Sequence, residues 1–285
     1  MYTSTRNAQL QLTSKQALTQ GFATDGGLFV LPSLPKVDLR QLLATDYQGQ
    51  AKIILKTLLP DFDVQVIDQV VTDAYGPQWD DARITPLKKL YDQYVLELFH
   101  GPTSAFKDIG LQVLPRLLRQ AIDAKDKVLI LAATSGDTGK AALEGFKDVP
   151  QTGIATFYPE GGVSPIQEKQ MRTTGGANTH VAAIKGNFDD AQTAVKHMLN
   201  NADLAAKLGT VKLSVANSIN IGRLAPQVVY YFNAYQQLIE AGAIKVGEPI
   251  NFTVPTGNFG DVLAGYYAKL MGLPVNKLIV ASNDN

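Results

Sequence analysis

The run Val128-Leu129-Ile130-Leu131-Ala132, followed at once by Thr134-Ser135-Gly136-Asp137-Thr138-Gly139, decides the fold of this chain. The first segment is continuously apolar, as is typical of a strand covered on both faces. The glycine-containing loop leads into helical spacing over 139–147. A buried strand that turns directly into a helix is the repeating unit of α/β proteins with parallel sheets.

The same alternation of strand-like and helical segments continues along the chain. It predicts an α/β fold, an open parallel-rich sheet with helices on both faces and right-handed crossovers. The expected strands are 94–99, 127–133, 153–158, 179–184, 211–215, 250–254 and 277–281. The expected helices are 109–124, 139–147, 165–173, 189–200, 223–240 and 261–271.

Residues 1–93 follow a different pattern and predict a mixed, mainly helical N-terminal domain. The expected elements are helices over 10–20, 51–59 and 64–74, a short edge strand within 25–32 and a linker over 76–86. A core domain is expected over 94–285, with 127–220 as a smaller subdomain. Since the sequence stops one loop after a strand, we expect this core to be incomplete at its C-terminus.

Composition makes a cytoplasmic enzyme the default class. The 285 residues are 45% apolar and 18% charged, with 26 basic and 26 acidic side chains, so no nucleic-acid or membrane surface is indicated. No cysteine is present and the three histidines are scattered, so neither a disulfide framework nor a metal site is expected. The N-terminus lacks an apolar leader segment.

The stretch His100-Gly101-Pro102-Thr103-Ser104-Ala105-Phe106-Lys107-Asp108 places a lysine at the start of a helix. The positive end of the helix dipole opposes the charge of Lys107 and favours the neutral amine. A neutral amine is what a Schiff base with an aldehyde cofactor requires. The alternative is a solvated surface lysine in an ordinary turn. His100 is either a proton carrier or a buried, hydrogen-bonded histidine, and we favour the second.

The loop at 134–139 has two interpretations. Its glycines let backbone amides approach an anion, and its hydroxyls add donors. Alternatively, it is a helix start with Asp137 or Thr138 as N-cap. A nucleotide-binding phosphate loop is excluded, because Thr134 stands where that motif needs glycine and Ala141 where it needs serine or threonine.

A second loop, 255–261, also joins a strand to a helix. Gly257 and Gly260 bracket Asn258 and Phe259, so that their amides form an anion nest suited to a phosphate monoester. Asp261 would repel a dianion, so we expect it to point away or to hold the loop by hydrogen bonds. A plain glycine-rich turn is the alternative.

Further polar groups follow two other segments. The run 164–169 opens a helix with Pro165 near its first position and contains Lys169. The run 217–223 offers amide, hydroxyl and guanidinium donors from Asn217, Ser218 and Arg223. Arg223 is suited to a bidentate pair with a carboxylate or phosphate, or is simply a surface residue. Trp79 and the cluster 230–232 are interpreted as packing.

A reactive lysine and two anion-binding loops together describe the demands of pyridoxal phosphate: a Schiff base, a substrate carboxylate seat and a cofactor phosphate seat. At these positions the sequence resembles the threonine synthase family. The segments that carry the resemblance are 100–103 with 106–108, 134–139, 217–220 and 257–261, with Asp25-Gly26-Gly27-Leu28-Phe29 as an early addition. The resemblance spans essentially the whole chain.

The resemblance implies a tryptophan-synthase-β-like fold, fold type II of the pyridoxal phosphate enzymes, with the catalytic core over 94–285 behind the domain 1–93. It implies a carbon–oxygen lyase that converts O-phospho-L-homoserine and water to L-threonine and phosphate, the last step of threonine biosynthesis. Lys107 would hold the cofactor and then carry protons. The other implied cofactor-binding residues are Phe106, Asp137, Gly257, Asn258, Phe259, Gly260 and Asp261. The implied substrate-binding residues are Ser135, Gly136, Thr138, Lys169, Asn217, Ser218 and Arg223.

Two alternatives to the synthase remain open. Serine/threonine dehydratases and cysteine synthases share the lysine and the glycine loops, but they usually carry asparagine where this chain has Asp137 and lack the N-terminal unit. The second alternative is that the chain is a truncated, non-catalytic protein that binds the cofactor or a partner. Threonine synthases are longer than this chain, so the residue that contacts the pyridine nitrogen is expected beyond Asn285. The sequence does not decide between monomer and homodimer.

Overall fold

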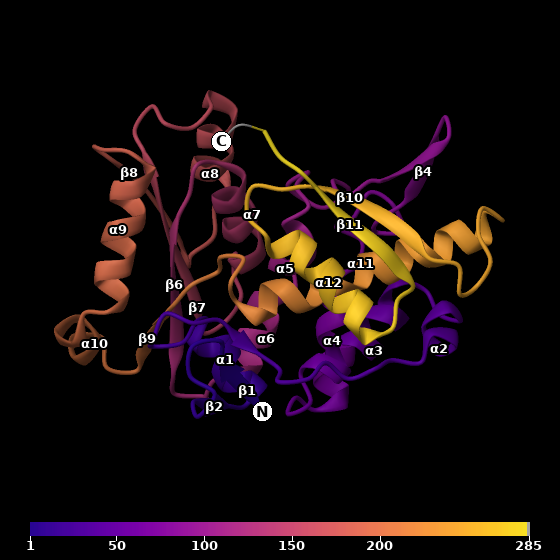
Figure 1. Cartoon of the computed structure of the whole chain (residues 1–285). Helices are drawn as coiled ribbons and strands as arrows, with labels where there is room; N and C mark the ends of the chain where they lie inside the picture. The colour runs from indigo at the N-terminus through magenta and orange to yellow at the C-terminus, as the bar shows by residue number, and fades with distance from the viewer. Residues whose placement is uncertain (284–285) are drawn as a thin grey trace.

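A four-stranded parallel sheet in the order β8-β7-β6-β9 forms one side of the molecule in the computed structural model, which describes residues 1–283 (Figure 1). Its strands are β6 (Lys127–Ala133), β7 (Thr152–Pro159), β8 (Thr179–Ile184) and β9 (Val211–Ser214). The connecting helices are α7 (Asp137–Phe146), α8 (Pro165–Thr173), α9 (Phe188–Leu199) and α10 (Ala202–Leu208). Helix α9 covers one face of the sheet and α7 lies on the other (Figure 1). The predicted parallel α/β arrangement is therefore confirmed for this region.

The other predicted strands do not extend this sheet. Strands β10 (Ile250–Pro255) and β11 (Val275–Ala281) form a separate parallel pair joined by α12 (Gly260–Met271). The expected strand 94–99 is β5 (Gln93–Leu96), which pairs with β4 (Leu87–Leu90) in an antiparallel hairpin. Strand β4 escaped prediction because Tyr91 has φ of 55° at the turn, a conformation usually marked by glycine, asparagine or aspartate.

The N-terminal residues form a small antiparallel sheet and short helices. The sheet order is β2-β1-β3, so Phe29–Val30 is the expected edge strand. The strands are β1 (Tyr2–Ser4), β2 (Gln11–Leu12) and β3 (Phe29–Val30), and the helices are α1 (Ser14–Gln20), α2 (Leu39–Leu43), α3 (Tyr47–Leu58) and α4 (Val64–Ala74). Helix α1 begins later than predicted because Thr13 and Gln16 form a capping box.

The predicted helix 109–124 is divided into α5 (Asp108–Leu111) and α6 (Leu114–Ala121). Pro115 has no backbone N–H and cannot donate to the carbonyl of Leu111, so a continuous helix would lose this hydrogen bond and meet the proline ring. Proline is tolerated instead in the first turn of α6. The break turns the chain between the lysine-bearing segment and α6.

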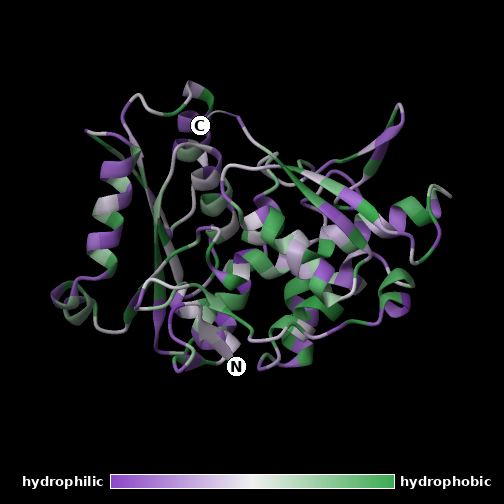
Figure 2. Ribbon diagram, viewed as in Figure 1, coloured by the Kyte–Doolittle hydropathy of each residue, from purple (hydrophilic) through white to green (hydrophobic). Residues whose placement is uncertain are grey.

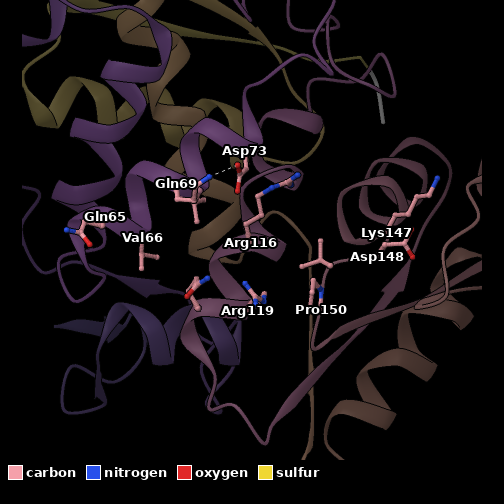
Figure 3. Close-up of a pocket in the computed structure, with 12 residues that line it drawn as sticks. Gln65, Val66, Gln69, Asp73, Arg116, Arg119, Lys147, Asp148 and Pro150 are labelled. Atoms are coloured by element: carbon pink, nitrogen blue, oxygen red, sulfur yellow. Dashed lines mark hydrogen bonds between the residues drawn. The ribbon is translucent and has the colours of Figure 1, made fainter.

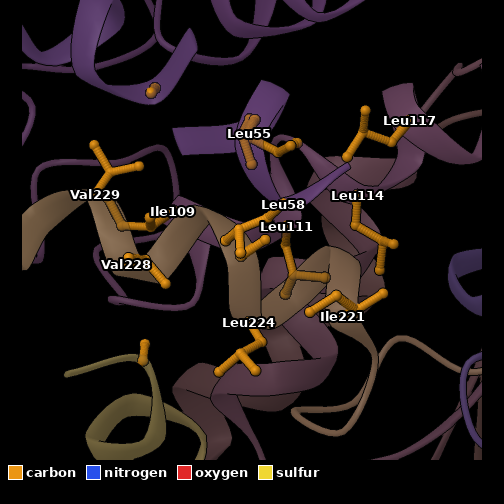
Figure 4. Close-up of a cluster of buried hydrophobic side chains, with 14 of the residues drawn as sticks. Leu55, Leu58, Ile109, Leu111, Leu114, Leu117, Ile221, Leu224, Val228 and Val229 are labelled. Carbon is orange, nitrogen blue, oxygen red and sulfur yellow. The ribbon is translucent and has the colours of Figure 1, made fainter. Parts of the chain in front are cut away.

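Helix α11 (Ile221–Glu240) is the centre of the hydrophobic core. All of its residues except Gln236, Ile239 and Glu240 are buried. Apolar residues concentrate on α11 and the helices around it (Figure 2). Figure 4 shows part of this core: Leu55, Leu58, Ile109, Leu111, Leu114, Leu117, Ile221, Leu224, Val228 and Val229. Within residues 1–283, no helix is both long and apolar enough to cross a membrane.

Buried amides connect α11 to the N-terminal residues. Gln237 donates to the carbonyl of Thr85 at 2.9 Å and accepts from the amide of Leu87 at 2.8 Å. Asn233 donates to the side chain of Gln50 at 3.3 Å. Since a buried polar group without a partner is costly, these bonds fix α11 relative to α3 and β4. The domain boundary at 93/94 therefore crosses a shared core and stays a prediction, as does the subdomain 127–220.

The core predicts a large difference between two leucine substitutions. Leu114→Ala removes a fully buried side chain and is expected to lower the free energy of unfolding by about 2–5 kcal/mol. Leu90→Ala, at a position 51% exposed, is expected to change it by less than about 0.5 kcal/mol. Urea denaturation of the two variants checks this, and equal losses would contradict the assigned core.

Candidate active site

The lysine turn and the first glycine loop meet at one ion pair. Lys107 Nζ donates to Asp137 Oδ2 at 2.6 Å, and it lies 4.7 Å from the centre of the Phe106 ring. The side chain of Lys107 is only 16% exposed, so the alternative of a solvated surface lysine is wrong. A helix dipole was expected to oppose the positive charge of Lys107. This effect is small because α5 has only four residues, and the negative charge of Asp137 offsets it.

Asp108 holds the lysine turn in shape. Its carboxylate is buried and accepts from the backbone amide of Thr103 at 2.8 Å and from the Thr103 hydroxyl at 2.7 Å. Burial raises the pKa of Asp108, while the bonds from Thr103 act in the opposite direction. Gly101 packs so close that a Cβ there would lie 2.7 Å from Cβ of Asp108. The sequence motif contained Asp108, but the role of its carboxylate depends on a turn that is seen only in the folded structure.

His100 links the lysine turn to the preceding segment. Its ring bonds Asp80 through Nδ1 at 2.6 Å and Glu97 through Nε2 at 2.9 Å, and it stacks on Phe99. Burial alone would lower the pKa of His100, but the bonds to Glu97 and Asp80 outweigh it and raise the pKa. The favoured hydrogen-bonded interpretation is confirmed.

Thr134 organises the first loop. Its hydroxyl accepts from the amides of Gly136 at 3.0 Å and Gly139 at 2.9 Å. The N-cap of α7 is Gly136, at φ 149°, and it makes no side-chain cap bond, so the interpretation with Asp137 or Thr138 as N-cap is wrong. Among the described residues, the amides of Asp137 and Thr138 have no hydrogen-bond partner. The helix start is therefore free to receive an anion.

The second loop offers another uncapped helix start. Phe259 is the N-cap of α12 and makes no side-chain cap bond. Within residues 1–283, the amides of Asn258, Phe259 and Gly260 have no partner, and a Cβ at Gly257 would meet open space. Gly260 packs on Ser218, whose Cβ would lie 2.9 Å from a Cβ at that glycine. The loops 257–260 and 217–220 are thus neighbours.

Asp261 points away from this loop, as expected. Its Oδ1 accepts from the hydroxyls of Tyr230 at 2.5 Å and Tyr231 at 2.8 Å, both on α11. Burial raises the pKa of Asp261, and the two tyrosine bonds partly offset it. The sequence interpretation of 230–232 as packing missed this second role, because hydroxyl partners so distant in sequence leave no local signal.

Arg223 is buried rather than at the surface. Its Nη1 donates to the carbonyl of Ala216 at 2.6 Å, and its Nε has no hydrogen-bond partner among the described residues. Burial lowers the pKa of Arg223 to about 10, while the charges of Asp137, Tyr230 and Asp108 act in the opposite direction. The carboxylates of the first loop and of the lysine turn therefore act on this guanidinium, and its ligand role stays a prediction.

The structure brings together some of the predicted site residues and leaves others apart. Lys107, Phe106 and Asp137 are in contact, and Ser218 adjoins Gly260. Lys169 and Asn217 are exposed, and within 1–283 no hydrogen bond joins either to another candidate. Gln167 was not among the predicted site residues, yet its side-chain amide packs against the first loop. A Cβ on Gly136 would lie 2.5 Å from the amide nitrogen of Gln167. The residue expected beyond Asn285 lies outside the described part of the chain.

Comparisons with known proteins point to one family. A family model described as threonine synthase N terminus matches residues 1–75. The chain is 41% identical over 293 residues to threonine synthase from Pseudomonas aeruginosa, covering 100% of this chain and 60% of that protein. It is also 41% identical over 286 residues to threonine synthase-like 1 from Macaca fascicularis, covering 95% of this chain and 38% of that protein.

Solved structures agree. Pyridoxal-phosphate-bound threonine synthase from Brucella melitensis has a TM-score of 0.89 at 39% identity, over 99% of this chain and 60% of that one. Threonine synthase from Escherichia coli has a TM-score of 0.84 at 36% identity, over 99% and 64%. These likenesses confirm the predicted tryptophan-synthase-β-like fold. The chain spans about 60% of the length of the synthases from Pseudomonas aeruginosa and Brucella melitensis.

The Thr134 hydroxyl predicts a measurable stability effect. Thr134→Val keeps the shape but leaves the buried amides of Gly136 and Gly139 without their acceptor, so the free energy of unfolding should fall by about 1–3 kcal/mol. Thr72→Val, on the exposed face of α4, is the matched control and should be near neutral. Denaturant titration of both variants decides, and a neutral Thr134→Val would contradict the assigned role.

His100 predicts a pH-dependent contribution to stability. Its folded-state pKa is raised above 6.5, so its stabilising contribution is fully present below that value and is lost as pH rises through the folded pKa. The stability gap between the wild type and His100→Gln should therefore be constant below pH 6.5 and shrink as the pH rises above it. Unfolding curves across this range test it, with exposed His180→Gln as control. A gap that widens with pH would contradict the assigned bonds.

Proposed function

This chain belongs to the family of threonine synthases and threonine synthase-like proteins, and we propose that it holds pyridoxal phosphate and forms L-threonine and phosphate from O-phospho-L-homoserine and water. The contact between Lys107 and Asp137 is the observation that carries the proposal, since it joins a reactive amine to an anion-binding loop. The proposal includes a cytoplasmic location, in keeping with a biosynthetic enzyme.

The residues present fit the cofactor at both of its ends. Its aldehyde needs an amine that is accessible yet held in place, and Lys107 is largely buried with its amine fixed by Asp137. Its phosphate needs unpaired amides, and within residues 1–283 those of Asn258, Phe259 and Gly260 have no partner, while a Cβ at Gly257 would meet open space. When bound, pyridoxal phosphate supplies an aldehyde that bonds amines and a ring that takes up electrons from the substrate carbons.

Lys107 and Asp137 are assigned the proton chemistry. Once freed from the cofactor, the amine of Lys107 is the group that would move protons at Cα and Cβ of the substrate as general base and acid. Asp137 holds Nζ at 2.6 Å and so keeps the amine oriented at the start of α7. Phe106 packs against the same amine and limits its freedom.

The substrate is assigned to the remaining polar groups. The free amides at the start of α7, with the side chains of Ser135 and Thr138, suit the substrate carboxylate. The substrate phosphate requires cations, and Arg223 and Lys169 are the candidates. Arg223 has the stronger support, because its buried Nε lacks a partner while Lys169 is exposed on α8.

Trapping the cofactor tests its attachment. The chain is incubated with pyridoxal phosphate, reduced with borohydride and mapped by mass spectrometry, and Lys107 is expected to carry the label. Lys107→Ala should abolish that label, whereas Lys169→Ala should keep it. Equal labelling of Lys107→Ala, or a label confined to other lysines, would contradict the assignment.

Turnover tests the reaction. Phosphate release from O-phospho-L-homoserine is expected, and Lys107→Ala should reduce it by about 10²–10⁴-fold or more, the range of a lost general acid–base group. Serine and threonine are offered in parallel. Their deamination without phosphate release from phosphohomoserine would favour a dehydratase. Labelling of Lys107 without any turnover would favour a cofactor-binding protein without catalytic activity.

A further inference from the structure

A cleft outside the candidate active site has an unusual balance of charge. It encloses about 520 Å³ between α4, α6 and the segment that follows α7 (Figure 3). Three cations line it, Arg116, Arg119 and Lys147, against two carboxylates, Asp73 and Asp148. Its volume lies within the range of about 300–1,000 Å³ that small-molecule sites occupy.

Both carboxylates are already engaged. Asp73 accepts from the Gln69 amide at 2.7 Å, a bond visible in Figure 3. Asp148 accepts from the backbone amide of Ala177 at 3.1 Å. Neither forms an ion pair with a cleft cation within residues 1–283.

Arg116 is the cation that most needs a partner. It is half-buried, and its Nη1 donates to the backbone carbonyl of Gln112 at 2.6 Å and to that residue's side chain at 3.4 Å. Among the described residues it has no carboxylate partner. Burial lowers the pKa of Arg116, and the charge of Asp73 partly offsets this. A guanidinium that is partly withdrawn from water, and that a nearby carboxylate compensates only in part without forming an ion pair, favours the arrival of an anion.

Helix dipoles explain only part of the positive charge. Arg119 is in the last turn of α6 and Lys147 follows α7, where cations are favoured by the negative end of each helix. Arg116 is the third residue of α6 and lies in its first turn, where the positive end of the dipole disfavours a cation. Since Arg116 and Arg119 are three residues apart, they lie on one face of the helix and can bind the same ligand.

The rest of the lining is amides and apolar side chains. Gln65 and Gln120 offer amide groups, which donate to and accept from polar atoms. Val66, Val70 and Val149 supply apolar surface beside them. We propose that the cleft binds a small organic anion, with a phosphate or carboxylate on Arg116 and Arg119 and a short apolar portion on the valines.

Three probes test the class of ligand by calorimetry on the whole chain at low salt: inorganic phosphate, n-butyl phosphate and pentanoate. At least one organic probe should bind saturably at this cleft. Butyl phosphate should bind more tightly than inorganic phosphate, by about fourfold for each methylene buried. The tighter of butyl phosphate and pentanoate identifies the anionic group. No saturable binding by either organic probe would overturn the proposal.

Variants separate this cleft from the candidate active site. Arg119→Gln changes an exposed side chain without risk to the fold, and it should weaken binding by about tenfold or more, as should Arg116→Gln. Lys107→Ala should leave the affinity unchanged, because Lys107 does not line the cleft. Affinity that survives both arginine variants, or that is lost in Lys107→Ala, would place the anion elsewhere and overturn the proposal. Neither result depends on whether the chain turns over phosphohomoserine.

Discussion

Everything in this fold depends on the burial of α11 on nearly every side. Helices α3, α5 and α12 pack against it, and the core in Figure 4 surrounds its first half. A helix in that position must also satisfy its polar side chains, and Asn233 and Gln237 do so with partners from the N-terminal residues. The N-terminal helices therefore pack as part of the same core as the helix that supports the glycine loops.

The candidate site follows from that support. Arg223 begins the buried helix beside Gly110 of α5, and Tyr230 and Tyr231 fix Asp261 at the start of α12. One helix thus reaches both the lysine segment and the second loop. The chemistry proposed for this site rests on few contacts, of which the ion pair of Lys107 and Asp137 is central. The surrounding hydrogen bonds hold those two side chains where a cofactor can meet them.

Local sequence patterns predicted much of the secondary structure. They failed where the conformation depends on residues that are distant in the sequence or lacks a local signal. The helix 64–74 and the strands 127–133 and 179–184 agree with the structure because their apolar spacing and flanking residues are sufficient. The hairpin at Tyr91 was not predicted, because its turn contains no glycine, asparagine or aspartate at the position with positive φ. The break before Pro115 was not predicted either, because this proline was placed inside one continuous helix. Arg223 was considered a possible surface residue, because its burial depends on packing that the local sequence does not show.

By itself, the sequence determined the alternation of strands and helices, the position of a lysine at a turn before a helix, and the two glycine loops, because each depends on neighbouring residues. The tertiary structure alone decided that the parallel strands divide between two sheets, that Asp137 faces Lys107, and that Asp261 turns toward two tyrosines. The physical reason is separation along the chain: Lys107 and Asp137 are 30 positions apart, and only packing brings their charges to 2.6 Å.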